Sequence, residues 1–246
     1  MTSLTTTGAF RGEWRPQGLL SRHVDRFWWG EAREGEQVDV LPDGCVDLVL
    51  AVPEGSGDLR DGGWTLHGSS LQTTALPLQS GRYFGVRFKP GQARHFLALD
   101  TPALLARHQP LGRSLPPLQP RRAEDWLQQS AAALLAQAPV ASARMERIDR
   151  ALLLLEAHGG QLDVARLAAQ SALSTRQLER LCLATTGVSP KWLSRVTRFQ
   201  AALAAVHGGG RSLAGIAQQM GYADQAHLAR DFRRFTGAAP SQLLKG

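Results

Sequence analysis

Two segments of the C-terminal half carry arginine and glutamine side chains in matching arrangements. Ser174–Leu193 reads STRQLERLCLATTGVSPKWL, and Asp224–Leu243 reads DQAHLARDFRRFTGAAPSQL. The two segments align without a gap, so that Arg180 matches Arg230. Arginine donates two hydrogen bonds to O6 and N7 of guanine, and glutamine pairs similarly with adenine. This repeat predicts a duplicated surface that reads bases in a groove of DNA.

Helix start and stop signals place these side chains on two helix-turn-helix units, at 163–186 and 212–236. Each unit is expected to consist of a short helix, a tight turn and a second helix whose apolar side packs on the first. Aspartate and serine side chains cap helix N-termini by accepting backbone hydrogen bonds, and glycine commonly ends a helix. The expected caps are Asp163 and Ser174 in the first unit and Ser212 and Asp224 in the second, with Gly187 and Gly237 as stops.

A longer helix is expected between the two units. Ser189 offers a cap, Pro190 suits the first helical position, and the helical pattern continues to His207. At about 1.5 Å per residue, this helix spans roughly 27 Å. Major-groove faces on one side of DNA recur at about 34 Å. The connecting helix, together with the width of the flanking units, is therefore expected to set two readers on consecutive turns.

Helical periodicity divides each second helix into an apolar face and a polar face. Leu178, Leu181 and Cys182 share the apolar face of the first, and Leu228 and Phe232 share that of the second. The outward residues are Arg176, Glu179 and Arg180 in the first unit and Gln225, Ala229 and Arg230 in the second. The matching arginines are expected to contact bases or phosphates, and a surface salt bridge is the alternative.

The net charge of the chain belongs to the same half. Residues 1–143 hold 14 Lys and Arg against 14 Asp and Glu, whereas residues 144–246 hold 14 against 7. The whole net charge of +7 therefore lies in the second part. A neutral domain joined to a basic one predicts that only the basic domain meets a polyanion. A structural nucleoid protein, which would carry positive charge on both domains, is disfavoured.

The segment Ile216–Leu243, IAQQMGYADQAHLARDFRRFTGAAPSQL, resembles the signature of the AraC/XylS transcription regulators. The resemblance extends over Arg144–Gly246 and implies a bacterial regulator with a seven-helix DNA-binding domain and a separate regulatory domain. Cys182 departs from the pattern by replacing a common phenylalanine, and Ala226-His227-Leu228 replaces Ser-Tyr-Phe, which implies a thinner core in the first unit. The base-facing positions implied by the resemblance are Arg176, Glu179, Arg180, Gln225, Ala226, His227, Ala229 and Arg230.

Other basic side chains of this domain are expected to contact phosphates or water rather than bases. They are Lys191, Arg195, Arg198, Arg211, Arg233 and Arg234. Phosphate contacts position a protein on the duplex without reading its sequence.

Strand signals precede helical ones in the N-terminal half. Runs of β-branched or aromatic residues lie at Val38–Val52, Trp64–Gly68 and Arg82–Lys89, bounded by Gly, Pro and Asp. Helix-forming composition follows in GQARHFLAL, TPALLARH and AEDWLQQSAAALLAQ. The chain is therefore expected to be α+β, with a β-rich N-terminal domain followed by an all-α C-terminal domain.

The expected domains are a regulatory domain at 1–137, a linker at 138–143 and the DNA-binding domain at 144–246. The segments FWWGEA, LPDGCVDLVL and GVRFKPGQARHFL resemble a β-rich regulatory domain found in some AraC-type regulators. This resemblance implies an architecture and no particular ligand.

Aromatic and charged residues of the N-terminal domain are candidates for a cavity that binds a small-molecule effector. Arg87 and Asp47 are its candidate polar anchors. The candidate effector-binding residues are Trp28, Trp29, Cys45, Asp47 and Arg87, and further aromatic candidates are Trp64, Tyr83, Phe84 and Phe88. Packing in the core of a β domain explains the aromatic residues as well.

Several function classes lack their signatures. The spacing of the seven His and two Cys residues forms no metal-binding pattern, and neither GxSxG nor GK[ST] occurs. No metal, no cofactor and no enzymatic activity are therefore expected. The chain has no apolar run of about 18 residues and does not begin with a basic and then apolar leader. A cytoplasmic location away from membranes is expected.

Cys45 supports an alternative function. Some DNA-binding repair proteins with a similar C-terminal architecture (Ada-like) accept alkyl groups on a reactive cysteine, and Cys45 follows the turn Pro42-Asp43-Gly44. Acceptor thiols activated by zinc need several clustered cysteines, and the N-terminal domain has one. The favoured function is therefore a sequence-specific DNA-binding transcription regulator that is modulated through its N-terminal domain.

The expected partners follow from this function. They are double-stranded DNA and an unidentified small-molecule effector, with RNA polymerase as a further candidate. The protein is expected to be a monomer or a homodimer, because Leu134 and Leu135 are suited either to a dimer face or to internal packing.

Overall fold

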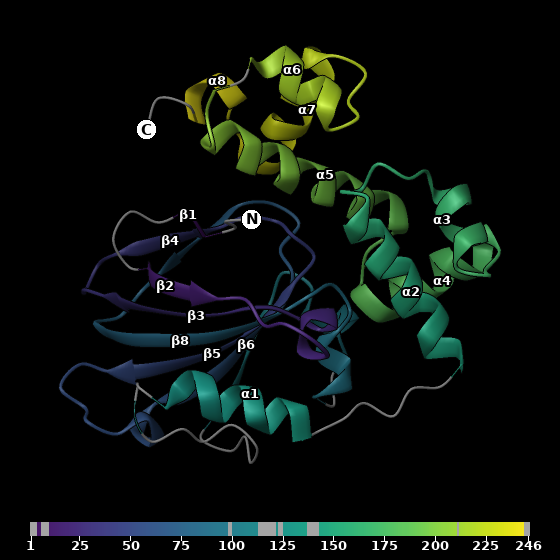
Figure 1. The fold of residues 1–246 in the computed structure, drawn as a ribbon. Coiled ribbons are helices and arrows are strands. Elements are labelled where there is room, and N and C mark those ends of the chain that lie inside the picture. Colours follow the sequence, from purple (N-terminus) through teal and green to yellow (C-terminus); the bar gives the residue numbers. More distant parts are fainter. Residues whose placement is uncertain are drawn as a thin grey trace.

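The computed structural model describes residues 4–5, 10–97, 100–112, 122, 125–136, 143–210 and 212–243. Two β-sheets form the N-terminal part, and helices form the C-terminal part, which lies across one side of them (Figure 1). The predicted α+β class is confirmed. Most of the expected linker lies outside the described residues, so the domain boundaries stay predictions. Within the described part of the chain, no helix is long and apolar enough to cross a membrane.

The main sheet is antiparallel, with the strand order β2-β3-β8-β5-β6-β9. The strands are β2 (Phe10–Trp14), β3 (Val24–Ala32), β5 (Val46–Pro53), β6 (Gly63–His67), β8 (Gly81–Phe88) and β9 (His108–Gly112). The strands expected at Trp64–Gly68 and Arg82–Lys89 are confirmed, whereas β2, β3 and β9 were not predicted. Strand β8 is central, because it pairs with β3 on one side and β5 on the other.

A smaller sheet has the order β1-β4-β7 and consists of Leu4–Thr5, Gln37–Val40 and Thr74–Pro77. The run expected over Val38–Val52 contains two strands, β4 and β5, which lie in different sheets on either side of the turn Pro42-Asp43-Gly44. The chain turns between them at a corner, residues 41–45. Gly44 there has a φ of 78°, a conformation that costs glycine little.

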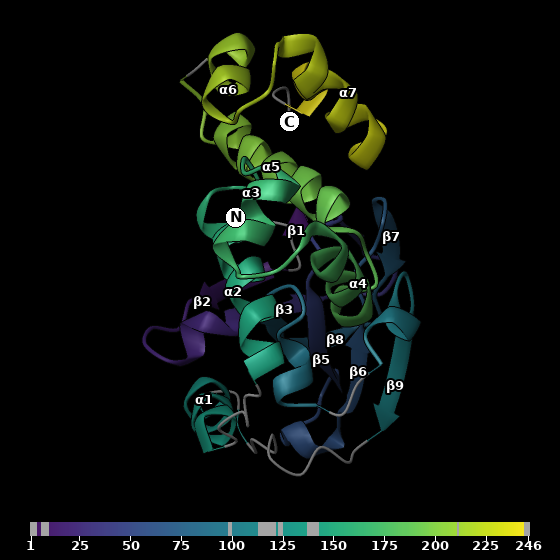
Figure 2. The ribbon, with the colours of Figure 1, turned by 90° about the vertical axis from the view of Figure 1, so that its right-hand side faces the viewer.

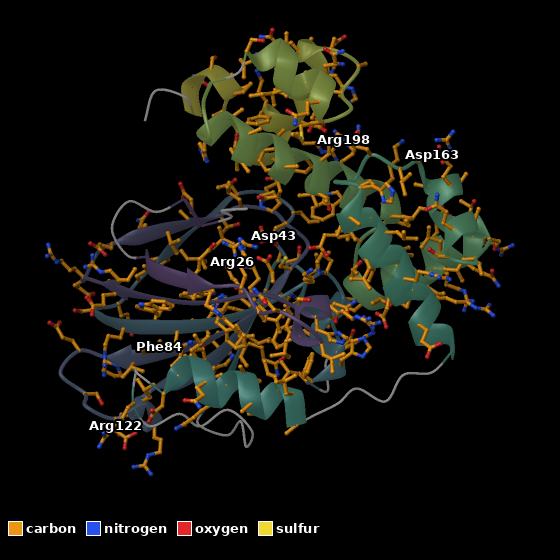
Figure 3. All side chains as sticks on the ribbon, in the orientation of Figure 1. Arg26, Asp43, Phe84, Arg122, Asp163 and Arg198 are labelled. Atoms are coloured by element: carbon orange, nitrogen blue, oxygen red, sulfur yellow. The ribbon has the colours of Figure 1, made fainter. Side chains whose placement is uncertain are left out.

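Side-chain alternation gives the main sheet two different faces. Phe84 lies on the face that α1 (Trp126–Ala136) covers, and its ring packs on Trp126 with 5.5 Å between centroids. Figure 3 shows Phe84 between the sheet and this helix. Tyr83 and Arg87, on the alternate positions of β8, face a cavity between the two sheets. One face is thus a closed core, and the other is hollow.

Helix α1 uses its two leucines differently. Leu134 is 1% exposed and belongs to the core of the β domain, whereas Leu135 is 50% exposed. Internal packing, one of the two alternatives for this helix, therefore applies to Leu134.

Two expected helices are wrong. In the described part of GQARHFLAL, residues 91–97, the only helical element is the 3-10 turn Ala93–His95, and in TPALLARH it is the 3-10 turn Pro102–Leu104. The second segment bonds back to the sheet edge, since Ala106 N donates to Ser69 O at 2.8 Å. Its residue 106 has a φ of 54°, which interrupts helical geometry before β9 begins. Tertiary contacts here override helix-forming composition.

The C-terminal domain contains seven helices within residues 143–243. They are α2 (Ala143–Ala157), α3 (Val164–Gln170), α4 (Thr175–Thr186), α5 (Pro190–His207), α6 (Leu213–Gln219), α7 (Gln225–Thr236) and α8 (Pro240–Leu243). The predicted N-caps are confirmed: the side chains of Asp163, Ser174, Ser189, Ser212 and Asp224 each accept a backbone hydrogen bond. Gly187 and Gly237 end α4 and α7 in left-handed geometry, as expected.

Both helix-turn-helix units pack on α5 in one core. Phe199 of α5 lies with its ring centroid 5.1 Å from Phe232 of α7. Leu178 and Cys182 of α4 belong to the same buried cluster, so the predicted inward faces are confirmed. Figure 2 shows α5 running between α3 and α4 on one side and α6 and α7 on the other. One helix therefore sets the relative orientation of the two units.

Gly85 tests how closely the hollow face of the sheet is packed. A Cβ at this position would lie 2.0 Å from Cε2 of Trp28. We expect Gly85→Ala to lower the free energy of unfolding by about 1–3 kcal/mol, the range for overpacking, as measured by denaturant unfolding. Gly57→Ala is the control, because a Cβ there meets nothing within 4 Å. Equal stability of the two variants would show that the Trp28 ring moves aside without cost.

Candidate nucleic-acid interface and effector cavity

Helix α4 presents the predicted DNA-facing residues of the first unit to solvent. Its start is fixed by a capping box, in which Gln177 N donates to Ser174 Oγ at 3.2 Å and Ser174 N donates to Gln177 Oε1 at 2.9 Å. Arg176, Glu179 and Arg180 follow on the exposed side of the helix. The cap and the buried face together orient this set outward.

Helix α7 does the same for the second unit, with one difference. Asp224 Oδ1 accepts a hydrogen bond from His227 N at 2.6 Å. The side chains of Gln225, Ala226 and Arg230 are exposed, whereas those of Ala229 and His227 are partly buried. The His227 ring stands edge-on to Tyr222, with 5.1 Å between centroids. Packing on the turn therefore occupies part of the His227 side chain.

Two arginines expected at phosphates are used inside the protein. Arg195 Nη2 donates to Asp231 Oδ1, and the Asp231 side chain is 1% exposed. Arg198 donates to Gly160 O at 2.9 Å and to Gly221 O at 3.3 Å, which ties the end of α2 to the turn of the second unit. Lys191, Arg233 and Arg234 are exposed, and Arg211 lies outside the described residues.

Comparison with known protein families matches both parts of the chain. Residues 167–246 match a helix-turn-helix domain, and residues 12–110 match a domain of unknown function (DUF6597). The chain carries an AraC-type DNA-binding domain. The resemblance carried by the segment Ile216–Leu243 is thereby confirmed. No curated protein sequence matches the chain.

The chain is similar to several solved structures, of which three are described. A transcriptional regulator from Chromobacterium violaceum is 23% identical, has a TM-score of 0.38, and its match covers 40% of this chain and 89% of that one. The DNA-binding domain of AdpA, solved with a target DNA, is 25% identical, with a TM-score of 0.38 and coverage of 41% and 90%. ToxT from Vibrio cholerae, bound to an unsaturated fatty acid, is 14% identical, with a TM-score of 0.46 and coverage of 94% and 97%.

Four of the five predicted effector residues meet at one cavity between the two sheets. Its volume is about 720 Å³, and Trp28, Cys45, Asp47 and Arg87 all line it. Trp29 lies apart from them, because successive residues of a strand point to opposite faces; its side chain packs on β2 and is 37% exposed. The structure therefore assembles a single candidate cavity without Trp29.

The other aromatic candidates divide between the cavity and the core. Tyr83 lines the cavity. Trp64, Phe84 and Phe88 are at most 4% exposed and belong to the core under α1, where the alternative of core packing applies.

Arg87 is held at the floor of the cavity by two carboxylates. Its Nε donates to the oxygens of Asp47 at 3.0 and 3.1 Å, and its Nη2 donates to Asp47 Oδ2 at 2.7 Å. Its Nη1 donates to Asp43 Oδ2 at 2.8 Å. Burial by itself lowers the pKa of Arg87, but Asp47 and Asp43 raise that pKa well above its ordinary value. The guanidinium therefore remains charged although its side chain is 2% exposed.

Cys45 lies next to this ion pair in a setting that suppresses its reactivity. Burial and the neighbouring Asp43 raise the pKa of the Cys45 thiol well above its ordinary value. The thiolate is the nucleophilic form of cysteine, so this environment disfavours an alkyl-acceptor role. Among the described residues, no cluster of three His, Cys, Asp or Glu residues is suited to hold a metal ion.

The corner at 41–45 packs against α5 of the AraC-type domain. Gln200 Nε2 donates to Pro42 O at 2.6 Å, and both residues are buried. Leu193 approaches Gly44 so closely that a Cβ there would lie 2.5 Å from Leu193 Cδ1. Leu41 is part of the helical core itself. The corner thus packs directly on α5, the helix that joins the two helix-turn-helix units.

The same corner also lines the cavity between the two sheets. Asp43, Cys45 and Arg87 line the cavity on one side, and they also line a second cavity of about 310 Å³ that reaches α2 and α5. Figure 3 places Asp43 and Arg26 between the sheets and the helices. Sequence reasoning identified the turn but not its contact with Gln200, since nothing in the sequence pairs residues 158 positions apart.

Further contacts join the N-terminal domain to both ends of the AraC-type domain. Thr73 donates to Phe235 O, the last turn of α7, from its backbone N at 3.1 Å and from Oγ1 at 2.8 Å. At the other end, Asp149 of α2 accepts hydrogen bonds from Arg94 and from Gln92 Nε2, the latter at 3.1 Å. The N-terminal domain therefore contacts α7 of the second helix-turn-helix unit and α2, the helix that precedes the first unit.

The surroundings of Asp149 predict that this interface responds to pH. Burial by itself raises the pKa of Asp149, but hydrogen bonds from His95 and Gln92 and the charge of Arg94 bring it below its ordinary value. A lowered carboxyl pKa contributes stability that is present above the unfolded-state value and is lost as pH falls through the folded-state value.

We expect Asp149→Asn to lower the free energy of unfolding at pH 7 by about 1.5–3 kcal/mol, the range for hydrogen bonds to charged groups. The difference from wild type should shrink below about pH 4, near the ordinary carboxyl pKa. Denaturant unfolding between pH 3 and 7 measures it, with the exposed Asp39→Asn as control. A difference that does not change with pH would assign Asp149 a role in packing alone.

Proposed function

We propose that this protein is a sequence-specific transcription regulator that places α4 and α7 in consecutive major grooves of DNA. The observation that carries the proposal is the duplication: Arg180 and Arg230 are both exposed at matching positions of two units that share one core. Two such helices presented by one chain do what a dimer of single-unit proteins does.

Charge supports this proposal. The excess of Lys and Arg over Asp and Glu is confined to residues 144–246. Exposed basic residues at 191, 233 and 234 supplement the arginines of the two outward faces. Such residues suit contacts with phosphates, which fix the register of a protein on the duplex.

The length of α5 supports the spacing. Its 18 residues correspond to roughly 27 Å of helix. The two units lie at opposite ends of it, and their widths add to this span. The sum is compatible with the roughly 34 Å between successive major-groove faces.

Regulation through the N-terminal domain is the second part of the proposal. Corner 41–45 contacts both the effector cavity and α5, and Thr73 contacts α7. A ligand that changes the position of the corner would act on the helix that sets the two units relative to each other. Coupling requires only that the ligand binds the alternative arrangements with different affinity.

The electrostatic part predicts a steep salt dependence. We expect the affinity of the full chain for duplex DNA to fall by roughly 10³-fold or more between 50 and 200 mM salt, the loss typical of six or more phosphate contacts. Fluorescence anisotropy with a labelled duplex measures this. An affinity that is flat over this range would refute the electrostatic part of the proposal.

The tandem part predicts two separate reading positions. Arg180→Ala and Arg230→Ala should each weaken binding by about 1–3 kcal/mol and relax base preference at one place, if each arginine pairs bidentately with guanine. The two relaxed places should lie about 10 base pairs apart. Selection of bound fragments from random duplex DNA, followed by sequencing, measures both.

Arg60→Ala is the matched control for these variants, because it removes an exposed arginine of the N-terminal domain. It should leave base preference unchanged. Uniform weakening of all sequences by both test variants would make the two arginines phosphate contacts. If only one of the two variants changes base preference, only the unit that carries that arginine reads bases.

A further inference from the structure

We propose that the cavity between the two sheets binds a small organic cation, a protonated amine carried on an apolar group, and rejects carboxylates of the same size. This inference rests on the proposed function in one respect: it takes this cavity to be the effector site. It goes further by assigning the chemical class of the ligand.

The charges that line the cavity are predominantly negative. Among the described residues of its lining, the acidic ones are Glu34, Asp43 and Asp47, and Arg87 is the one Lys or Arg. His67 adds no fixed positive charge, because burial lowers the pKa of its imidazole. An incoming ligand therefore meets a net negative surface, which favours a cation.

Arg87 is unavailable as an anion site. Its Nε, Nη1 and Nη2 all donate to Asp47 or Asp43, and its side chain is 2% exposed. A carboxylate ligand would have to displace one of these partners and would then lie beside the displaced charge. Breaking a buried ion pair costs several kcal/mol, so the residue that most resembles an anion anchor in the sequence does not act as one.

The remaining lining fits an apolar group. Val38 and Leu76 from the small sheet face Val49 and Ala51 from β5 across the cavity. The small side chains of β5, together with Gly85 of β8, leave the space that the Trp28 ring partly fills. A volume of about 720 Å³ lies within the range of small-molecule sites.

Aromatic rings stand close to the acidic groups. Trp28 lines the cavity and donates from Nε1 to Asp47 Oδ1 at 3.2 Å, which fixes its ring beside that carboxylate. Tyr83 lines the same cavity from β8. An ammonium group gains from both a carboxylate and the face of an aromatic ring. The combination of carboxylates, aromatic rings and aliphatic walls is that of a site for an amphipathic amine.

Three probes of one size and different charge test the inference. We would titrate the full chain with 4-phenylbutylamine, 4-phenylbutanol and 4-phenylbutyrate at pH 7 by isothermal titration calorimetry. We expect the amine to bind at least tenfold more tightly than the acid, with the alcohol between them. Failure of the amine to bind, or binding of the acid at least as tightly, would overturn the proposal.

Two variants of the lining and one outside it locate the effect. Glu34→Gln, at an exposed position, should weaken the amine severalfold. Asp47→Asn should remove the preference for the amine or reverse it, because Arg87 then lacks its principal partner. Asp39→Asn lies on β4 between two lining valines, but its exposed side chain is outside the cavity, and it should change nothing. Amine binding that all three variants leave unchanged would overturn the proposal.

A parallel measurement separates this inference from the proposed function. Anisotropy with duplex DNA, with and without 4-phenylbutylamine, reports on regulation. Amine binding without any change in DNA affinity would support the ligand class and refute regulation through this cavity. If the wild-type chain does not bind duplex DNA at all, the proposed function is refuted, whereas the calorimetric result on the ligand class still stands.

Discussion

The guanidinium of Arg87 lies in the interior of the N-terminal domain, where a lone charge is not tolerated. Its stability there depends on Asp47, which β5 supplies from the neighbouring strand, and on Asp43, which the corner at 41–45 supplies. Removing one member of a buried pair typically costs about 3–5 kcal/mol. This constraint fixes the corner against the main sheet. It also determines the charge of the cavity, because the carboxylates are required by the arginine and remain when a ligand enters.

The position of the corner has consequences beyond the β domain. Pro42 O accepts a hydrogen bond from Gln200, and Gly44 leaves room for Leu193, so two residues of α5 depend on where the corner lies. Helix α5 carries one helix-turn-helix unit at each end. A shift of the corner would therefore displace the contacts that α5 makes with it. Because α5 packs in the core shared by both units, it would move as a rigid body rather than bend. The cavity and the DNA-facing surfaces are connected by a short path of packed residues.

Arginine plays three different roles in this protein, and the surroundings decide which. Arg87 is buried and saturated by carboxylates, Arg198 holds two backbone carbonyls together, and Arg180 is exposed on an outward helix face. Within the basic C-terminal domain, the arginines thus divide between internal support, as for Arg198, and an exposed surface suited to a polyanion, as for Arg180. Arg195 pairs with the buried Asp231 and therefore supports the interior, although its position in the sequence suggested phosphate contact.

The sequence by itself determined the helical half of the protein and the fact that it is duplicated. Capping by Ser174 or Asp224 acts over three residues, and the face on which Leu178 or Leu228 lies follows from helical periodicity, so local patterns suffice. The β half was different, because strand pairing joins residues that are far apart in the chain. Only the tertiary structure decided that Val38–Val52 belongs to two sheets, that Trp28 faces the cavity while Trp29 does not, and that Asp43 neutralises Arg87. Those contacts join residues that are distant in the chain, 19 positions apart for Trp28 and Asp47 and 44 for Arg87 and Asp43. Their energies depend on burial, which no local pattern specifies.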